Sequence, residues 1–256
     1  MKLIKVIPGQ SEWKWGKLGP KWSDKTLIGF DAETTSQFPL QAKILSASII
    51  IDVPGNEPIV YEWLLNQTPI PIQSISVHGI TEEKVIIDGM DPAIGIKQII
   101  EKLYQVKIDY PNIPIVIVNA NYDCSVLNEQ SKEFLGHSLD INKIPFIIDS
   151  LTLDRIVWPY RRGRRILSAT LSAYNGIIQS AHTSTGDTLA GIKLVRLIGE
   201  KYPYVGHASL SHLQKVQADA HKQWCDQYEE YQHIENPDFM IGNSKNWPII
   251  NGDNND

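Results

Sequence analysis

The sequence predicts an α/β protein built on a mixed five-stranded sheet that is flanked by helices. Apolar, β-branched runs of strand length occupy residues 27–30, 43–53 and 59–65, and turn signals separate them. A continuous apolar run at 115–118 and a short one at 145–150 follow, each after a segment with helical periodicity. After the last run only helical patterns remain. This order, a three-strand meander and then helix, strand, helix, strand, is typical of a mixed sheet with helices on its faces.

Helical periodicity marks the remaining elements. In residues 93–106, apolar side chains recur three and four positions apart and share one helical face. Residues 74–81 are predicted as a loop, from which a short helix can start at Thr81. Further helices are expected at residues 119–134, 167–174, 183–200 and 210–231.

We expect one main domain at residues 25–235, an N-terminal extension at 1–24 and a C-terminal tail at 236–256. A chain of 256 residues can hold one large domain, and its apolar content of 42% is ordinary for a globular protein. The extension interleaves lysines with three tryptophans, of which Trp22 is the last, and such a pattern can stack on single-stranded nucleic acid. More commonly, tryptophans of this kind pin an extension onto its domain, so both roles stay open.

Charge and cysteine content narrow the partners and the compartment. The net charge is −5, so a polyanionic partner would have to be attracted by local patches or bound metal. The two cysteines, Cys124 and Cys225, have no metal-binding spacing, which favours a reducing compartment. The sequence shows neither a signal peptide nor a window of membrane-spanning length. We therefore expect a cytoplasmic protein that makes no use of a membrane.

Two carboxylates end the first strand, in the sequence LIGFDAETT that begins at residue 27. Because side chains alternate along a strand, Asp31 and Glu33 point the same way. Neighbouring carboxylates repel each other, and burying them unpaired is costly, so a cation is their natural partner. Hard carboxylate ligands suit Mg²⁺ or Mn²⁺. A D-x-E triplet also arises by chance in an acidic chain of this length, so the prediction depends on further acids downstream.

Two further acids and a histidine follow at fitting places. Asp123 lies on the first turn of the helix after the central strand, where α/β folds present functional groups, and Asn119 is a candidate cap for that turn. Asp187 begins a later helix, with His182 on the loop before it, so the two side chains can converge. Each has an ordinary alternative: a helix-start acid for the aspartates and a satisfied structural histidine for His182.

Together these motifs resemble those of the DnaQ-like 3′–5′ exonucleases, and more narrowly the DEDDh subgroup of the DNA polymerase III epsilon type. They fall in the family's order and in the matching strand or helix context. The similarity covers roughly residues 26–200. Its motifs are Asp31-Ala32-Glu33-Thr34-Thr35, Val77-His78-Gly79-Ile80-Thr81, Asn119-Ala120-x-Tyr122-Asp123, Asp149-Ser150-Leu151 and His182-x₄-Asp187.

The resemblance implies an RNase H-like fold and a hydrolase that removes nucleoside monophosphates from a 3′ end. By this similarity the four acids hold two Mg²⁺ (or Mn²⁺) ions. Asp31 is implied to bridge both ions, with Glu33 and Asp187 completing the first site. Asp123 serves the second ion, and His182 acts as the general base toward the attacking water.

The resemblance also implies a pocket for the terminal nucleotide, whose His78-Gly79 corner is alternatively a simple turn. The dense basic cluster at residues 161–165 would hold the phosphate backbone of the incoming strand, and is alternatively a solvated loop. The predicted substrate-binding residues are Thr34, Thr35, His78, Gly79, Asn119, Arg161 and Arg162.

Departures from the family's pattern are modest. Val118 stands where a histidine is frequent, and Tyr122 where phenylalanine is commoner. The stretch between His182 and Asp187 lacks a frequent alanine. None of these changes removes a liganding atom, so they concern substrate contacts rather than catalysis.

Three functions stay open on sequence grounds. The favoured one is a 3′–5′ DNA exonuclease acting on a single-stranded or frayed 3′ end, alone or with a polymerase partner in replication or repair. The second is a 3′–5′ exoribonuclease of the oligoribonuclease or RNase T type, because nothing in the motifs reads the 2′-hydroxyl. The third is a non-catalytic nucleic-acid-binding module. Such a module is expected to lose a liganding acid, and here all four are present.

Overall fold

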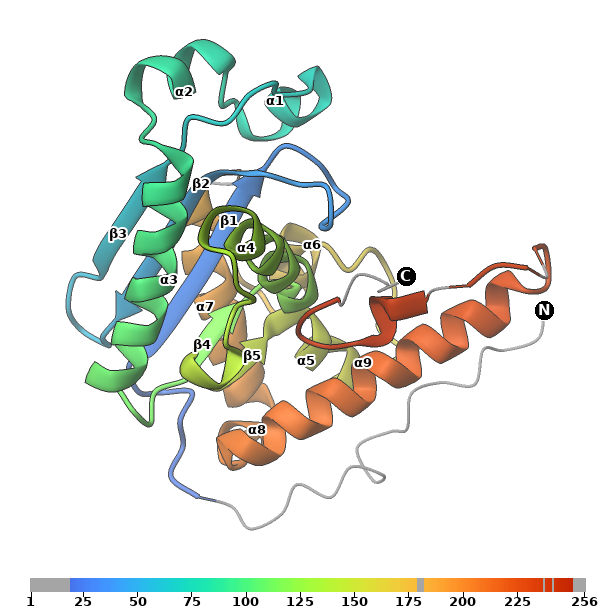
Figure 1. Cartoon of the computed structure of the whole chain (residues 1–256). Helices are drawn as coiled ribbons and strands as arrows, with labels where there is room; N and C mark the ends of the chain where they lie inside the picture. Colours follow the sequence, from blue (N-terminus) through green and yellow to red (C-terminus); the bar gives the residue numbers. More distant parts are fainter. Residues whose placement is uncertain (1–18, 179–181, 237, 241, 251–256) are drawn as a thin grey trace.

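The computed structural model describes residues 19–178, 182–236, 238–240 and 242–250. Its strands form one sheet in the order β3-β2-β1-β4-β5 (Figure 1). The pairs β1–β2 and β2–β3 are antiparallel, whereas β1–β4 and β4–β5 are parallel. The predicted mixed five-stranded sheet is therefore confirmed. The strands span β1 Leu27–Thr34, β2 Ile44–Asp52, β3 Ile59–Leu64, β4 Ile115–Ile117 and β5 Ile147–Asp149.

Helices cover both faces of the sheet and one of its ends (Figure 1). Helices α3 and α4 lie on one face, α7 lies on the other, and α1 and α2 project beyond the end of the sheet. The helices span α1 Ile72–His78, α2 Glu82–Asp88, α3 Pro92–Asp109, α4 Ala120–Leu135, α5 Ser150–Val157, α6 Leu167–Ala173, α7 Ser184–Lys201, α8 Pro203–Gly206 and α9 Leu210–Gln232, with the short 3₁₀ turns η1 Ile141–Lys143 and η2 Gly242–Lys245.

Side chains of β1 point alternately to the two faces of the sheet, so they contribute to two separate cores and set the direction of Asp31 and Glu33. Ile28 and Phe30 pack into the core under α3 and α4, whereas Leu27 belongs to the core under α7. Gly29 faces α7 so closely that a Cβ there would lie 2.3 Å from the side chain of Thr188. Because the side-chain period of a strand is two, the odd-numbered acids that follow also point toward the α7 side.

Three segments differ from the sequence prediction. Residues 72–78 form helix α1 rather than a loop; its seven residues are fewer than the window over which helical periodicity can be recognised, and none of them is buried. It ends at Gly79, whose φ of 72° provides the left-handed C-cap that glycine favours. Helices α5 and α8 were not predicted. Helix α5 begins directly after β5, at Ser150, which was the last residue of the strand predicted at 145–150.

The described part of the N-terminal extension is pinned to the body. Trp22 is buried, and its indole N–H donates to the carbonyl of Val205 at 3.0 Å. Trp13 and Trp15 lie outside the described residues. Among the helices that the structure describes, none combines the length and the apolarity needed to cross a bilayer.

Candidate active site

Three carboxylates from two elements converge at the end of the central strand. Asp31 and Glu33 come from β1, and Asp187 comes from the first turn of α7. Each offers an oxygen that lies within 4.8 Å of the oxygens offered by the other two. Helix α7 is held in place locally by Thr183, whose side chain accepts the N–H of Gly186 at 3.0 Å. The structure therefore brings together three of the four predicted metal ligands.

The cluster is electrostatically unfavourable without a counter-ion. Burial raises the pKa of Asp31 well above its usual range, and the neighbouring carboxylates raise it further. Burial and then the charge of Asp187 raise the pKa of Glu33 to about 7. The pKa of Asp187 is also raised by burial, although the backbone N–H of His182 donates to its carboxylate and opposes this. All three pKa values are therefore shifted toward the protonated form, and a bound cation would oppose this shift.

Asp123 approaches the same strand from the start of α4. It is buried, and its Oδ1 accepts the backbone N–H of Ala32 at 3.2 Å. Burial raises its pKa well above the usual range despite that hydrogen bond, and its charge raises the pKa of Asp31. Asp123 lies outside the set of three mutually close carboxylates, in line with the separate role implied for it.

His182 lies on the loop that leads into α7. Its side chain is exposed, and its backbone has a left-handed φ of 63°. It lines a cavity of about 360 Å³ together with Glu33 and His78. The loop before α7 thus brings His182 to the same cavity as Glu33.

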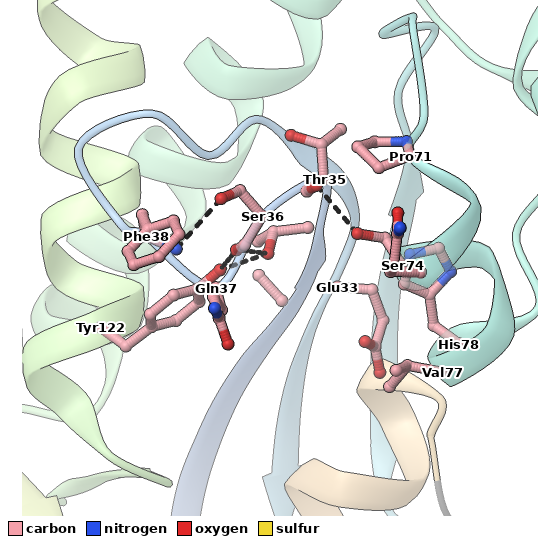
Figure 2. Close-up of a pocket in the computed structure, with 13 residues that line it drawn as sticks. Glu33, Thr35, Ser36, Gln37, Phe38, Pro71, Ser74, Val77, His78 and Tyr122 are labelled. Carbon is pink, nitrogen blue, oxygen red and sulfur yellow. Dashed lines mark hydrogen bonds between the residues drawn. The ribbon is translucent and has the colours of Figure 1, made fainter.

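A second cavity, of about 590 Å³, is also lined by Glu33 and His78 (Figure 2). Its walls come from the end of β1, the loop after it, α1 and α4. Three of the predicted pocket residues, Thr34, Thr35 and His78, line it. Gly79 follows directly after α1 and is not part of this lining.

The imidazole of His78 has a defined hydrogen-bonding state. Its Nδ1 accepts the backbone N–H of Ile80 at 3.0 Å, which leaves the ring proton on Nε2. Burial lowers the pKa of His78, with a partial opposing effect from the backbone of Thr34. The Nε2 atom itself is buried, so His78 forms part of the cavity wall without presenting this nitrogen to the cavity.

Hydrogen bonds from neighbouring helices shape this cavity. The Tyr122 hydroxyl of α4 donates to the carbonyl of Ser36 and also bonds the hydroxyl of Thr34 (Figure 2). From α1, the hydroxyl of Ser74 donates to the carbonyl of Thr35 at 2.8 Å. Sequence reasoning did not assign these bridging roles. The signal for one of them was available, because tyrosine replaces the commoner phenylalanine at position 122.

The start of α4 is held by Asp149 rather than by Asn119. Asn119 has a left-handed φ of 58°, is exposed, and makes no side-chain cap bond. The buried carboxylate of Asp149 instead accepts the backbone N–H groups of Asn119 and Ala120 at 3.3 and 3.1 Å. It also caps the next helix by accepting the N–H groups of Leu151 and Thr152. The expectation that Asn119 caps this turn is therefore corrected.

The basic cluster at residues 161–165 divides into buried and exposed members. Arg161 is only 8% exposed, and its guanidinium bonds the buried carboxylate of Asp154 at 3.0 to 3.1 Å. Arg165 bonds the same carboxylate. Arg162 and Arg164 are exposed. This corrects the prediction for Arg161, because its buried guanidinium already bonds Asp154, the carbonyl of Arg164 and the hydroxyl of Thr170.

Comparison with known proteins shows which fold this is. No known family's sequence profile and no curated protein sequence matches the chain. Among solved structures, it is similar to the zinc-bound form of Escherichia coli exonuclease I with single-stranded DNA, at 17% identity and a TM-score of 0.58 over 77% of this chain and 43% of the other. It is also similar to E. coli exonuclease I with a dA16 oligonucleotide, at 18% identity and a TM-score of 0.57 over 77% and 44%.

A product-bound exonuclease I gives a TM-score of 0.57 at 15% identity, over 77% of this chain and 46% of the other. The chain thus spans less than half the length of each of these structures. Likeness at such identities shows the fold, and it confirms the predicted RNase H-like architecture. Fold and site together define an α/β protein with the fold of exonuclease I and a carboxylate cluster at the end of its central strand.

Proposed function

We propose that this chain is a metal-dependent 3′–5′ exonuclease that hydrolyses nucleic acid, with DNA favoured, and releases nucleoside monophosphates. The observation that carries the proposal is the convergence of Asp31, Glu33 and Asp187 within 4.8 Å beside two cavities. Support comes from the fold of exonuclease I, which has been solved with single-stranded DNA and with a zinc ion. Because one fold can host many functions, the proposal rests on the carboxylate site together with the fold.

The donor set fits hard divalent cations. It consists of carboxylate oxygens only, which Mg²⁺ and Mn²⁺ prefer. Asp31, Glu33 and Asp187 would hold one ion, and Asp123 would serve a second one that shares Asp31. Such ions, when bound, supply a more acidic attacking water and neutralise charge on the departing 3′ oxygen.

The remaining roles belong to the chain's own side chains. His182 takes the proton of the attacking water, since its imidazole is exposed to the cavity that Glu33 lines. Thr34, Thr35 and His78 line the larger cavity and hold the terminal nucleotide there. Gly79, which follows α1, and Asn119, which precedes α4, lie near the larger cavity and contact the nucleic-acid strand there.

The narrower assignments are also part of the proposal. The order of the motifs supports the DEDDh subgroup of the epsilon type, with a polymerase partner and a role in replication or repair. Arg162, exposed on its turn, would contact the phosphate backbone of the strand.

A nuclease assay with Asp31→Asn tests the proposal. In Mg²⁺ or Mn²⁺, the wild-type protein should shorten 5′-labelled single-stranded DNA one nucleotide at a time. From 3′-labelled DNA it should release the labelled mononucleotide in the first step. Chelator should stop the cleavage. Asp31→Asn should abolish this, because it removes the ligand shared by both ions. Asp88→Asn, which changes an exposed acid on α2, is the matched control and should keep full activity.

Parallel RNA substrates complete the assay. Faster cleavage of RNA than of DNA would reassign the substrate to RNA. No cleavage of single- or double-stranded DNA or RNA with either cation, or full activity in Asp31→Asn, would contradict the proposal.

A further inference from the structure

We infer that residues 244–250, here called the C-terminal clasp, position Asp123 by holding the first turn of α4 from behind. This inference rests on the proposed function, because it assigns Asp123 a place beside the metal site. The clasp touches neither metal nor substrate in this account. It acts through the helix that carries the acid.

The clasp bonds α4 on both sides of Asp123 in the sequence. The side-chain amide of Asn121 donates to the carbonyl of Asn246 at 2.6 Å. The backbone N–H of Ile250 donates to the hydroxyl of Ser125 at 2.8 Å. Asn121 and Ser125 are four residues apart and share one helical face. Asp123 lies two residues from each, which at 3.6 residues per turn places it about 200° around the helix.

The opposite face of this turn is held by β1 and the loop after it. Asp123 accepts the N–H of Ala32 at 3.2 Å, and the Tyr122 hydroxyl donates to the carbonyl of Ser36. The first turn of α4 is therefore held between the acidic strand and the clasp. Without the clasp, the turn would keep its bonds to β1, to the loop after it and to Asp149, but its back face would lose both of the bonds that steady Asp123.

The clasp is itself anchored to the body. Lys245 forms an ion pair with Asp226 of α9 at 2.8 Å, and His221 of the same helix bonds the carbonyl of Ser244 at 2.8 Å. Trp247 packs against the core under α3 and α4. Ser125 is fully buried, so its bond to the clasp is shielded from water. These contacts make the clasp a fixed support for α4.

Mn²⁺ titration of folded variants by calorimetry tests this inference. Groups that orient a metal ligand typically change metal affinity by 10–100-fold, so we expect Asn121→Ala/Ser125→Ala to weaken Mn²⁺ binding about tenfold and to lower kcat with little change in KM. Ser131→Ala is the matched control. It removes another buried hydroxyl of α4, one that bonds the carbonyl of His137 at 2.7 Å and does not touch the clasp. Its Mn²⁺ affinity should equal that of the wild type.

Wild-type Mn²⁺ affinity in the folded double variant would overturn the inference and leave the proposed function standing. If the double variant does not fold, Asn121→Ala and Ser125→Ala are titrated singly, and unchanged affinity in both overturns it equally. A wild-type protein that binds Mn²⁺ but cleaves no nucleic acid would overturn the proposed function. A weaker affinity in the double variant would still support the clasp in that case.

Discussion

Glu33 combines a buried carboxyl group with a position beside Asp187, and its pKa rises from 4.5 to about 7. In the metal-free protein the native state therefore keeps a proton that the unfolded state has lost between these two values. Because the native state binds more protons there, the contribution of Glu33 to the free energy of unfolding is fully present below pH 4.5 and is lost as the pH rises through 7. Glu33→Gln removes this contribution and should flatten the decline across that window.

Urea unfolding in chelator at several values between pH 4.5 and 8 measures this effect. Added Mg²⁺ should restore stability to the wild type mainly at the upper end of the range, where the carboxylates are charged and can bind it. Parallel curves for the wild type and Glu33→Gln would show that the carboxyl group titrates normally.

His182 is predicted to act as the general base. His182→Ala should keep the fold, since the side chain is exposed, and should lower turnover by roughly 10²–10⁴-fold. Single-turnover cleavage of a labelled strand measures the loss. His137→Ala, which removes another exposed histidine after α4, serves as the control and should cleave at the wild-type rate. If His182→Ala cleaves as fast as His137→Ala, His182 is not the general base.

At the scale of elements, the packing of α7 on β1 joins the two halves of the acidic cluster. A Cβ at Gly29 would lie 2.3 Å from Thr188 and 2.8 Å from Ile192, so the helix or the strand would have to shift. Gly29→Ala should therefore cost roughly 1–3 kcal/mol of stability by overpacking. It should also weaken metal binding, because Asp31 and Asp187 would move apart.

Thermal and urea unfolding of Gly29→Ala check the stability loss. Gly19→Ala is a suitable control, because a Cβ there would meet only the carbonyl of His207 at an ordinary 3.8 Å. Similar stabilities for the two variants would mean that α7 adjusts without strain.

At the scale of the whole molecule, the net charge of −5 makes local basic surfaces decisive for binding a polyanion. The turn that carries Arg162 and Arg164 is held by the buried Asp154 ion pairs, and it presents both guanidiniums to solvent. If both arginines contact phosphates, the double variant Arg162→Ala/Arg164→Ala should bind DNA with a weaker salt dependence. The slope of the log association constant against log salt concentration should decrease in magnitude by up to about 2.

Fluorescence anisotropy of labelled single-stranded DNA in chelator, over a series of salt concentrations, measures this slope. Lys97→Ala/Lys143→Ala removes two exposed charges from α3 and η1 and should leave the slope unchanged. The same slope in all three proteins would assign the turn to the solvated surface.

Local pattern was sufficient for most of the architecture. Strands were predictable because apolar runs and turn residues recur over a few positions, and helices because their period differs from that of strands. The pairing of Asp31 with Glu33 followed from the two-residue period of a strand. The order of the motifs was enough to expect Asp123, His182 and Asp187 near the same strand end.

Only the tertiary structure decided which side chains have free access to the site and which are held by the protein. Arg161 and Arg162 are neighbours in sequence, yet one is enclosed with Asp154 and the other is exposed. Likewise, Asp149 holds the start of α4, and the clasp holds it from behind. Such roles depend on contacts between residues far apart in the chain, and on burial that follows from them. The periodicity of apolar residues predicts neither these contacts nor this burial, because it indicates only which face of its own helix or strand a residue occupies.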